Sequence, residues 1–139
     1  MVGIVIVTHG QLGEALIETA AMIFDERPKE VVSVSIDLSV DVNKLRSRIK
    51  KAISSVNSND GIIILTDMFG GTPSNLSYSF LEEGRIEVIS GVNLPVLIKA
   101  ANLRNRGKEL PEMVKTIEEY GKKSISLASD ILKGNKRGQ

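Results

Sequence analysis

His9 is the only histidine of the chain, and it stands beside Gly10 at the end of an aliphatic run, residues 2–8, with the pattern of a strand buried on both faces. A lone histidine is more often structural than functional. In open parallel sheets, however, ligands bind beyond the carboxyl ends of the strands, where a glycine lets them approach the backbone. Because an imidazole exchanges protons near neutral pH, this position predicts that His9 is a catalytic residue.

Asp67 follows a second aliphatic run, residues 62–66, in the same way. An aspartate at such a place can simply form or cap a turn. If the two strands are neighbours, however, the side chains of Asp67 and His9 converge at one edge of the sheet. A carboxylate that accepts the Nδ1 proton fixes the imidazole tautomer and leaves the Nε2 lone pair as a nucleophile, so we predict a catalytic pair.

Gly70, Gly71 and Thr72 come next and lead through Pro73 into a predicted helix with Thr72 as its N-cap. Taken alone, this is an ordinary glycine-containing turn. Two glycines can also turn backbone N–H groups inward as an anion site, to which a threonine hydroxyl and a helix start add donors. Beside a histidine nucleophile, these residues and Gly10 predict a cradle for a phosphoryl group, whose transfer depends mainly on positioning and charge stabilisation.

The composition of the 139 residues narrows the classes of protein. A hydrophobic fraction of 42% and a charged fraction of 25% are typical of one globular domain. The absence of cysteine excludes disulfides, thiolate zinc sites and cysteine nucleophiles, and a single histidine excludes a metal site built on several imidazoles. A net charge of +1 and 4% aromatic residues give no reason to expect nucleic acid as a partner. No apolar stretch is long enough to span a bilayer, so we expect a cytoplasmic protein without membrane insertion.

The elements that must position these residues alternate along the chain. Aliphatic runs predict strands at residues 2–8, 31–36, 62–66 and 86–90. Helical spacing and helix-starting residues, among them an Asp41 N-cap, predict helices at residues 12–23, 42–56, 72–83, 95–103 and 111–121. Gly84 and Gly121 are expected to close the third and the last of these helices. The alternation predicts an open doubly wound α/β fold with four parallel strands in the order 2-1-3-4 and helices on both faces.

The C-terminal part of the chain follows a different pattern. Residues 124–127 alternate polar and apolar side chains, which predicts a half-exposed antiparallel edge strand. The polar residues that end the chain have nothing to bury and predict a frayed tail. We therefore expect one domain over residues 1–130 and a tail over residues 131–139.

Three motifs occur in order: IVTHG at residues 6–10, TDMFGGTPSN at residues 66–75 and ISGVNLPVL at residues 89–97. With these motifs, residues 2–127 resemble the IIA component of the mannose family of the bacterial phosphoenolpyruvate-dependent sugar phosphotransferase system (PTS). This resemblance, rather than the composition, implies a phosphotransferase function.

The resemblance also implies a mechanism and partners. His9 would accept a phosphoryl group from the phosphocarrier protein HPr, with Asp67 as its carboxylate partner and the loop at residues 70–73 holding the phosphoryl oxygens. A IIB component would then accept the group before a sugar is phosphorylated during uptake. The implied mechanism requires no cofactor and no metal. Family members are usually homodimers that exchange a C-terminal edge strand, which would fall at residues 123–127.

The chain departs from the family pattern in two ways. Many relatives have tryptophan where this chain has Phe69, but an aromatic residue is kept, so we expect Phe69 to contact partner proteins. With Phe69, the side chains of Met22, Ile23 and Phe24 could form an apolar rim, although core packing explains these three equally well. No fused IIB domain follows in the sequence, so the acceptor, the sugar and the choice between transport and regulation are open.

Three other functions stay open at this point. The phosphocarrier subunit of a dihydroxyacetone kinase also has a histidine after its first strand. Tetrapyrrole metal chelatases place a His-Gly pair at the same position, although metal insertion normally recruits further histidine or acidic ligands. The third alternative is a binding module whose partner senses phosphorylation of His9.

Overall fold

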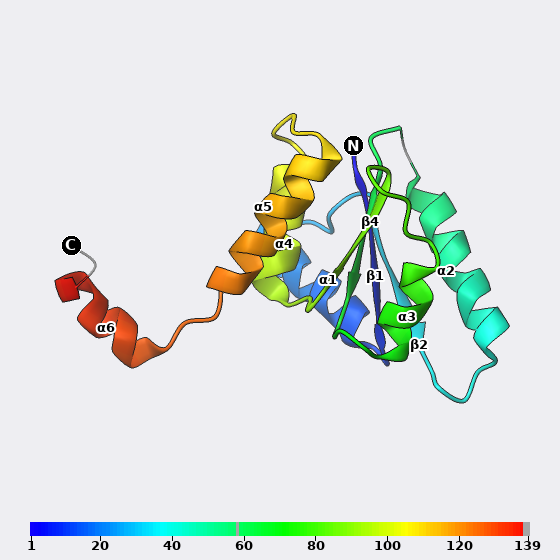
Figure 1. Cartoon of the computed structure of the whole chain (residues 1–139), viewed down its shortest axis with the longest axis horizontal. Helices are drawn as coiled ribbons and strands as arrows, with labels where there is room; N and C mark the ends of the chain where they lie inside the picture. Colours follow the sequence, from blue (N-terminus) through cyan, green and yellow to red (C-terminus); the bar gives the residue numbers. More distant parts are fainter. Residues whose placement is uncertain (58, 138–139) are drawn as a thin grey trace.

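A four-stranded parallel sheet forms the centre of the molecule (Figure 1). The computed structural model describes residues 1–57 and 59–137. The strands are β1 (Gly3–His9), β2 (Val31–Ile36), β3 (Ile62–Thr66) and β4 (Ile86–Ser90), and they lie in the order β2-β1-β3-β4. All three neighbouring pairs are parallel. The predicted fold class and strand order are therefore confirmed.

Helices cover both faces of the sheet (Figure 1). One face carries α1 (Leu12–Phe24), α4 (Leu94–Leu103) and α5 (Leu110–Lys123), and the other carries α2 (Val42–Val56) and α3 (Thr72–Tyr78). Asp41 caps α2, as predicted, by accepting a hydrogen bond from the backbone N–H of Asn43 at 3.0 Å. The helices that connect the strands return the chain to their amino ends, so all four carboxyl ends open at the same edge of the sheet.

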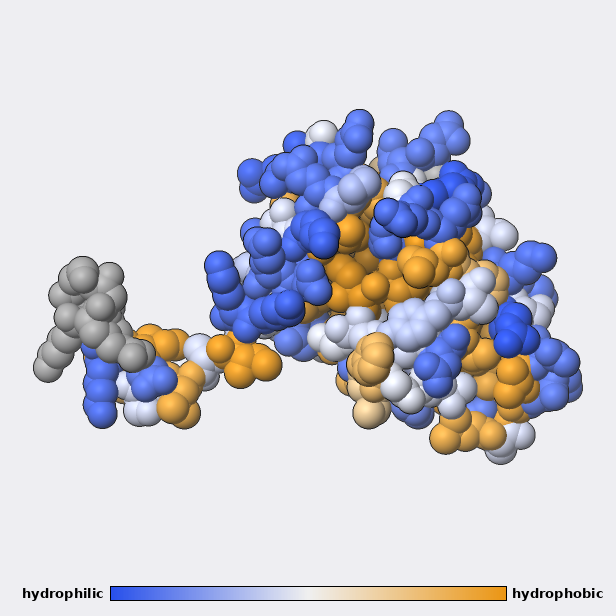
Figure 2. Space-filling view, viewed as in Figure 1, coloured by the Kyte–Doolittle hydropathy of each residue, from blue (hydrophilic) through white to orange (hydrophobic). Residues whose placement is uncertain are grey.

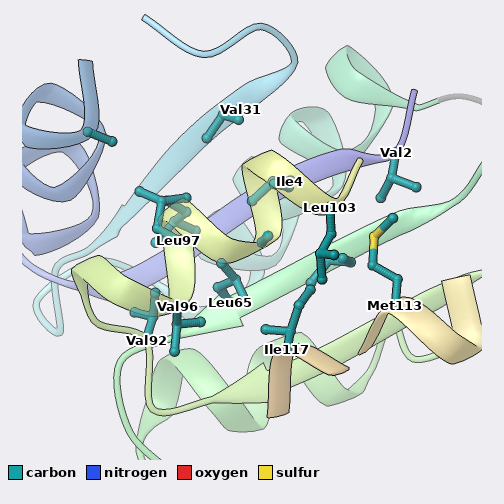
Figure 3. Packing of buried hydrophobic residues seen from close by; sticks show 14 of the residues in the cluster. Val2, Ile4, Val31, Leu65, Val92, Val96, Leu97, Leu103, Met113 and Ile117 are labelled. Carbon is teal, nitrogen blue, oxygen red and sulfur yellow. The ribbon is translucent and has the colours of Figure 1, made fainter. Parts of the chain in front are cut away.

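Apolar side chains bury the two central strands, β1 and β3, on both faces. Along β1, Ile4 faces the layer of α1, α4 and α5, whereas its neighbour Val5 faces the layer of α2 and α3. Figure 3 shows the first of these layers, in which Leu97 of α4 and Ile117 of α5 belong to the same cluster as Leu65 of β3. This two-sided core fixes the strands and therefore the positions of the residues at their carboxyl ends.

α3 ends at Tyr78, earlier than the sequence predicts. The hydroxyls of Ser77 and Ser79 donate to carbonyls of the preceding turn, and the last backbone hydrogen bonds reach only three residues back. The chain then reverses in a tight turn at residues 82–86, where Gly84 has a φ of 83°. Gly84 therefore provides the positive φ of this turn and does not end α3, contrary to the prediction from the sequence.

The predicted edge strand at residues 123–127 is wrong for the single chain. α5 continues to Lys123, and residues 124–127 pair with no strand of the part that the structure describes. The side chain of Ile125 is 82% exposed, because no element of the same chain covers the alternating segment. A further helix, α6 (Ala128–Arg137), follows and stands away from the sheet (Figure 1).

Gly121 lies within α5 and does not close it. A Cβ at this position would stand 2.9 Å from Cγ2 of Val96, so the glycine permits the close approach of α5 to α4. α6 takes up most of the residues predicted as a tail, and residues 138–139 of that tail lie outside the described residues. In the described part of the chain, no helix is long and apolar enough to cross a membrane.

Candidate active site

His9 and Asp67 meet at the carboxyl edge of the sheet, because His9 ends β1 and Asp67 follows the neighbouring strand β3. One oxygen, Asp67 Oδ2, accepts the backbone N–H of His9 at 2.9 Å and lies 2.8 Å from His9 Nδ1. With an ionised carboxylate, this second contact requires the proton on Nδ1 and directs Nε2 away from Asp67. The two side chains thus converge as the adjacency of their strands requires.

Asp67 is held as a carboxylate. Burial raises its pKa, but the hydrogen bonds from the backbone N–H and the ring of His9, the charge of that ring and the N–H of Met68 together hold the pKa below its ordinary value. The Asp67 side chain is 11% exposed, whereas that of His9 is 39% exposed and accessible from solvent. A positive charge on the imidazole is therefore stabilised next to a site that a partner can reach. Among the described residues, no group of three or more His, Cys, Asp or Glu side chains could hold a metal ion.

The glycine loop lies against the imidazole. A Cβ on Gly71 would stand 3.0 Å from His9 Cε1 and 3.6 Å from Nε2, so a larger residue would make the ring or the loop shift. Gly70 and Gly10 have φ angles of 89° and 53°, in the left-handed region that favours glycine. The N-cap of α3 is Gly71, and Thr72 is the first helical residue instead of the predicted cap. The Thr72 hydroxyl makes no hydrogen bond to any residue that the structure describes.

The loop that carries His9 into α1 is fixed from two strands. The Ser35 hydroxyl donates to the Gly10 carbonyl at 2.5 Å, and the Gly10 N–H donates to the Ile36 carbonyl at 3.1 Å. The buried Thr8 hydroxyl accepts the N–H of Gly13 at 2.9 Å, which holds the start of α1 close to β1. The backbone on both sides of His9 is thereby held in place.

Sequence reasoning missed a cluster of hydroxyls behind the site. Thr66, Ser74 and Ser90 come from β3, α3 and β4, and their oxygens lie 2.9–3.1 Å apart. The Ser74 hydroxyl also donates to the Met68 carbonyl, and the Tyr78 hydroxyl lies 3.2 Å from that of Ser90. One of the hydroxyls could have been noticed, because Thr66 is the single polar residue of the otherwise apolar strand β3.

An exposed apolar rim surrounds the site. Leu12, Leu38, Met68 and Phe69 follow the carboxyl ends of β1, β2 and β3, and all four have largely exposed side chains. Phe69 is 78% exposed, and its ring centroid lies 6.3 Å from that of Tyr78. The sequence alone identified only Phe69. Leu12, Leu38 and Met68 come together only because of the strand order, which the sequence does not show directly.

Met22, Ile23 and Phe24 do not belong to this rim, so that interpretation is wrong. The alternative, core packing, holds for Phe24 alone, because Met22 and Ile23 are exposed. These residues end α1, which runs back from the carboxyl edge to the opposite end of the sheet. Phe24 packs against the core there and lines a small pocket with Pro28.

Comparisons with known proteins agree with this fold. The family model EIIA-man, described as "PTS system fructose IIA component", matches residues 3–118. The chain is 29% identical over 133 residues to the PTS system fructose-specific EIIA component of Bacillus subtilis (strain 168), covering 95% of this chain and 90% of that relative. It is 28% identical over 125 residues to the mannose-specific EIIAB component of Escherichia coli (strain K12), covering 89% of this chain but only 38% of that longer protein. The crystal structure of the EIIA component from Streptococcus agalactiae superposes with a TM-score of 0.82 at 25% identity and covers 93% of this chain and 98% of that one.

These matches favour a PTS phosphocarrier over a dihydroxyacetone kinase subunit, a metal chelatase or a binding module. They extend over the strands that carry both His9 and Asp67. The chain therefore belongs to the EIIA-man family, the IIA phosphocarrier components of sugar phosphotransferase systems.

Proposed function

We propose that the protein carries the phosphoryl group on His9 as a phosphohistidine. The observation that carries this proposal is the 2.8 Å contact between His9 Nδ1 and Asp67 Oδ2. It supports the tautomer whose lone pair lies on Nε2, on the side of the ring away from Asp67. His9 and Asp67 are therefore the proposed catalytic residues.

The transfer step balances on these two side chains. Nε2 attacks the phosphorus of the phosphohistidine of HPr in line with the bond that breaks, and the electron pair of that bond returns to the donor imidazole. The ring of His9 keeps its Nδ1 proton and becomes positively charged when the Nε2–P bond forms. Ionised Asp67 stabilises that charge, and the same events in reverse pass the group to a IIB component.

The phosphoryl oxygens are proposed to bind at Gly10, Gly70, Gly71 and Thr72. Three features support this role: the close approach of Gly71 to the ring, the positive φ of Gly10 and Gly70, and the Thr72 hydroxyl, which has no partner among the described residues. Backbone N–H groups and a hydroxyl can stabilise the charge of the transferred group without a further cation.

HPr is the proposed donor and IIB the proposed acceptor, and both would meet His9 at the exposed apolar rim. An apolar rim around a partly exposed nucleophile suits successive partners that must dock and leave. We place this exchange in the cytoplasm. Phe69 is the proposed central contact, because it is the aromatic residue of the rim and the most exposed of its four side chains.

Phosphorylation in a reconstituted system tests the proposal. The protein is incubated with phosphoenolpyruvate, enzyme I and HPr, and its intact mass is measured before and after acid treatment. We expect one acid-labile phosphoryl group on the wild type and none on His9→Ala. Asp67→Ala should fold but accept the phosphoryl group more slowly, because no carboxylate then holds the His9 ring in the tautomer with the proton on Nδ1. A wild type that gains no phosphate, or a His9→Ala variant that still gains it, contradicts the proposal.

A homodimer is also proposed, and the outer edge of β4 supports it. Among the strands of the described residues, β4 pairs with β3 alone, and the groove between its other edge and α5 has a volume of about 1040 Å³. Figure 2 shows apolar surface in this region, to which Leu81, Val88 and Val114 contribute. The alternating residues 123–127 of a second copy would cover that edge as an antiparallel strand, as the resemblance to the family implies.

A further inference from the structure

The hydroxyl cluster of Thr66, Ser74, Ser90 and Tyr78 lies directly behind the loop that faces His9. It joins three elements, since Thr66 ends β3, Ser90 ends β4, and Ser74 and Tyr78 belong to α3. The side chains of Thr66 and Ser74 are fully buried. Buried hydroxyls need partners, and those of Thr66 and Ser74 find them in each other, in Ser90 and in one backbone carbonyl, while the exposed Tyr78 hydroxyl contacts Ser90.

The protons of the cluster can be assigned so that each is used once. Thr66 donates to Ser90 at 2.9 Å, and Ser74 donates to the carbonyl of Met68. Ser90 donates to Ser74 at 3.1 Å, and in this assignment no proton lies in the 2.9 Å contact between Thr66 and Ser74. Tyr78 donates to Ser90 at 3.2 Å. The result is a directed chain of hydrogen bonds that ends on the catalytic loop, and bonds in such a chain polarise one another.

The loop depends on this anchor. The Met68 carbonyl belongs to the peptide unit that joins Met68 to Phe69. The hydrogen bond from Ser74 to this carbonyl therefore orients the backbone that continues into Gly70 and Gly71. Gly70 and Gly71 place little conformational restriction of their own on the chain. Gly71 nevertheless approaches the His9 ring so closely that a Cβ on it would stand 3.0 Å from His9 Cε1.

We propose that Ser74 is a positioning residue for phosphoryl transfer, acting through the Met68 carbonyl to hold the loop against His9. This inference rests on the proposed function of His9. Ser74 touches neither the ring nor the transferred group, so its effect is on the rate of transfer and not on the binding of the donor.

Ser77 offers a matched control in the same helix. Its hydroxyl is equally buried and also donates to a carbonyl, that of Pro73, at 2.6 Å. That bond lies within α3, so Ser77→Ala and Ser74→Ala each remove one buried hydroxyl but only the second releases the loop. A general loss of stability would therefore affect both variants alike.

The experiment measures the single-turnover rate of phosphoryl transfer from phospho-HPr over a range of HPr concentrations. For Ser74→Ala we expect the maximal rate to fall by about tenfold to a hundredfold, with the half-saturating concentration changed by less than about twofold. Ser77→Ala should transfer at the wild-type rate. Wild-type transfer by Ser74→Ala, or equal losses in both variants, would overturn the proposal.

A second measurement does not depend on phosphorylation. Amide hydrogen exchange at residues 69–72 should be faster in Ser74→Ala than in the wild type and unchanged in Ser77→Ala. If the wild type accepts no phosphoryl group, the proposed function fails, and the exchange rates still decide whether Ser74 holds the loop. If Ser74→Ala does not fold, Ser90→Ala removes a hydroxyl that lies 3.1 Å from that of Ser74 and should change both readouts in the same direction; no change there contradicts the proposal.

Discussion

A single oxygen of Asp67 holds both the main chain and the ring of His9, and this couples the charge of the site to the stability of the fold. The pKa of Asp67 is below its ordinary value in the folded protein, so below about pH 4 the unfolded chain binds this proton more readily than the native one. The stabilising contribution of Asp67 is therefore fully present above that pH and is lost as the pH falls through the native pKa.

Asp67→Asn should consequently be less stable than the wild type at pH 7, and the difference should shrink as the pH falls below about 4. Urea unfolding of both proteins at a series of pH values measures this. Asp37→Asn is a useful control, because its carboxyl also has a lowered pKa, caused mainly by hydrogen bonds from Ser39, but it is fully exposed and does not contact His9. A gap between the wild type and Asp67→Asn that stays constant down to about pH 2 would contradict the argument.

Gly71 should be required for activity more than for stability. Its backbone angles are open to any residue, but an alanine Cβ would stand 3.0 Å from His9 Cε1, so the ring or the loop must shift. We expect Gly71→Ala to slow phosphoryl transfer by about tenfold or more while changing the unfolding free energy by less than about 1 kcal/mol.

Gly84→Ala is the control for Gly71→Ala, because it should affect stability but not activity. It places alanine at a φ of 83° in a turn at the far end of β4, where no atom lies within 4 Å of the new Cβ. It should lower stability by about 1 kcal/mol and leave transfer unchanged. Equal transfer rates for Gly71→Ala and the wild type would show that the loop does not need to approach the ring this closely.

At the scale of the elements, the contact of α4 with α5 depends on Gly121. An alanine there would bring a Cβ within 2.9 Å of Cγ2 of the buried Val96, closer than two carbon atoms normally approach. Gly121→Ala should therefore lower the unfolding free energy by about 1–3 kcal/mol, measured by urea denaturation.

The cause can be checked with a double mutant. Val96→Ala alone removes buried methyl groups and is destabilising, but in the Gly121→Ala background it makes space for the new Cβ. The double variant should therefore be more stable than the sum of the two single changes predicts. Simple additivity would mean that the two residues are not in conflict and that Gly121 has another role.

The strands and most helices could be predicted from the sequence, because each buries a continuous apolar run or stripe. The runs at β1 and β3 are aliphatic throughout, and the glycine and Asp residues after them sit where parallel strands end. The end of α3 was not predictable in this way, since the hydroxyls of Ser77 and Ser79 compete for its carbonyls. The alternating pattern of residues 124–127 indicates a strand, but a strand also needs a neighbour, and periodicity along one chain does not supply one.

The residues of the candidate site likewise fall into those that could be predicted from the sequence and those that could not. His9, Asp67 and the glycines could be identified because their residue types are rare or conformationally distinctive at strand ends. The cluster around Ser74 could not, since serine is common and its role depends on three elements meeting at one point. The apolar rim likewise depends on which loops share an edge of the sheet, which the strand order decides.

At the scale of the whole molecule, the open edge of β4 and the exposed segment at residues 123–127 are two features that one interface would explain together. Ile125 and Leu127 alternate with serines, so on one face of an added strand both would enter an apolar groove. A monomer would leave both apolar surfaces in water.

Ile125→Glu should therefore convert a dimer into a monomer, because it places a charge against apolar and acidic side chains in the groove. Sedimentation equilibrium at several protein concentrations measures the change. Met22→Glu makes the same replacement at an exposed position of α1 at the opposite end of the sheet, and it should leave the dimer intact. A wild type that is monomeric at every concentration, or equal dissociation in the two variants, would contradict strand exchange and leave the edge of β4 to another partner.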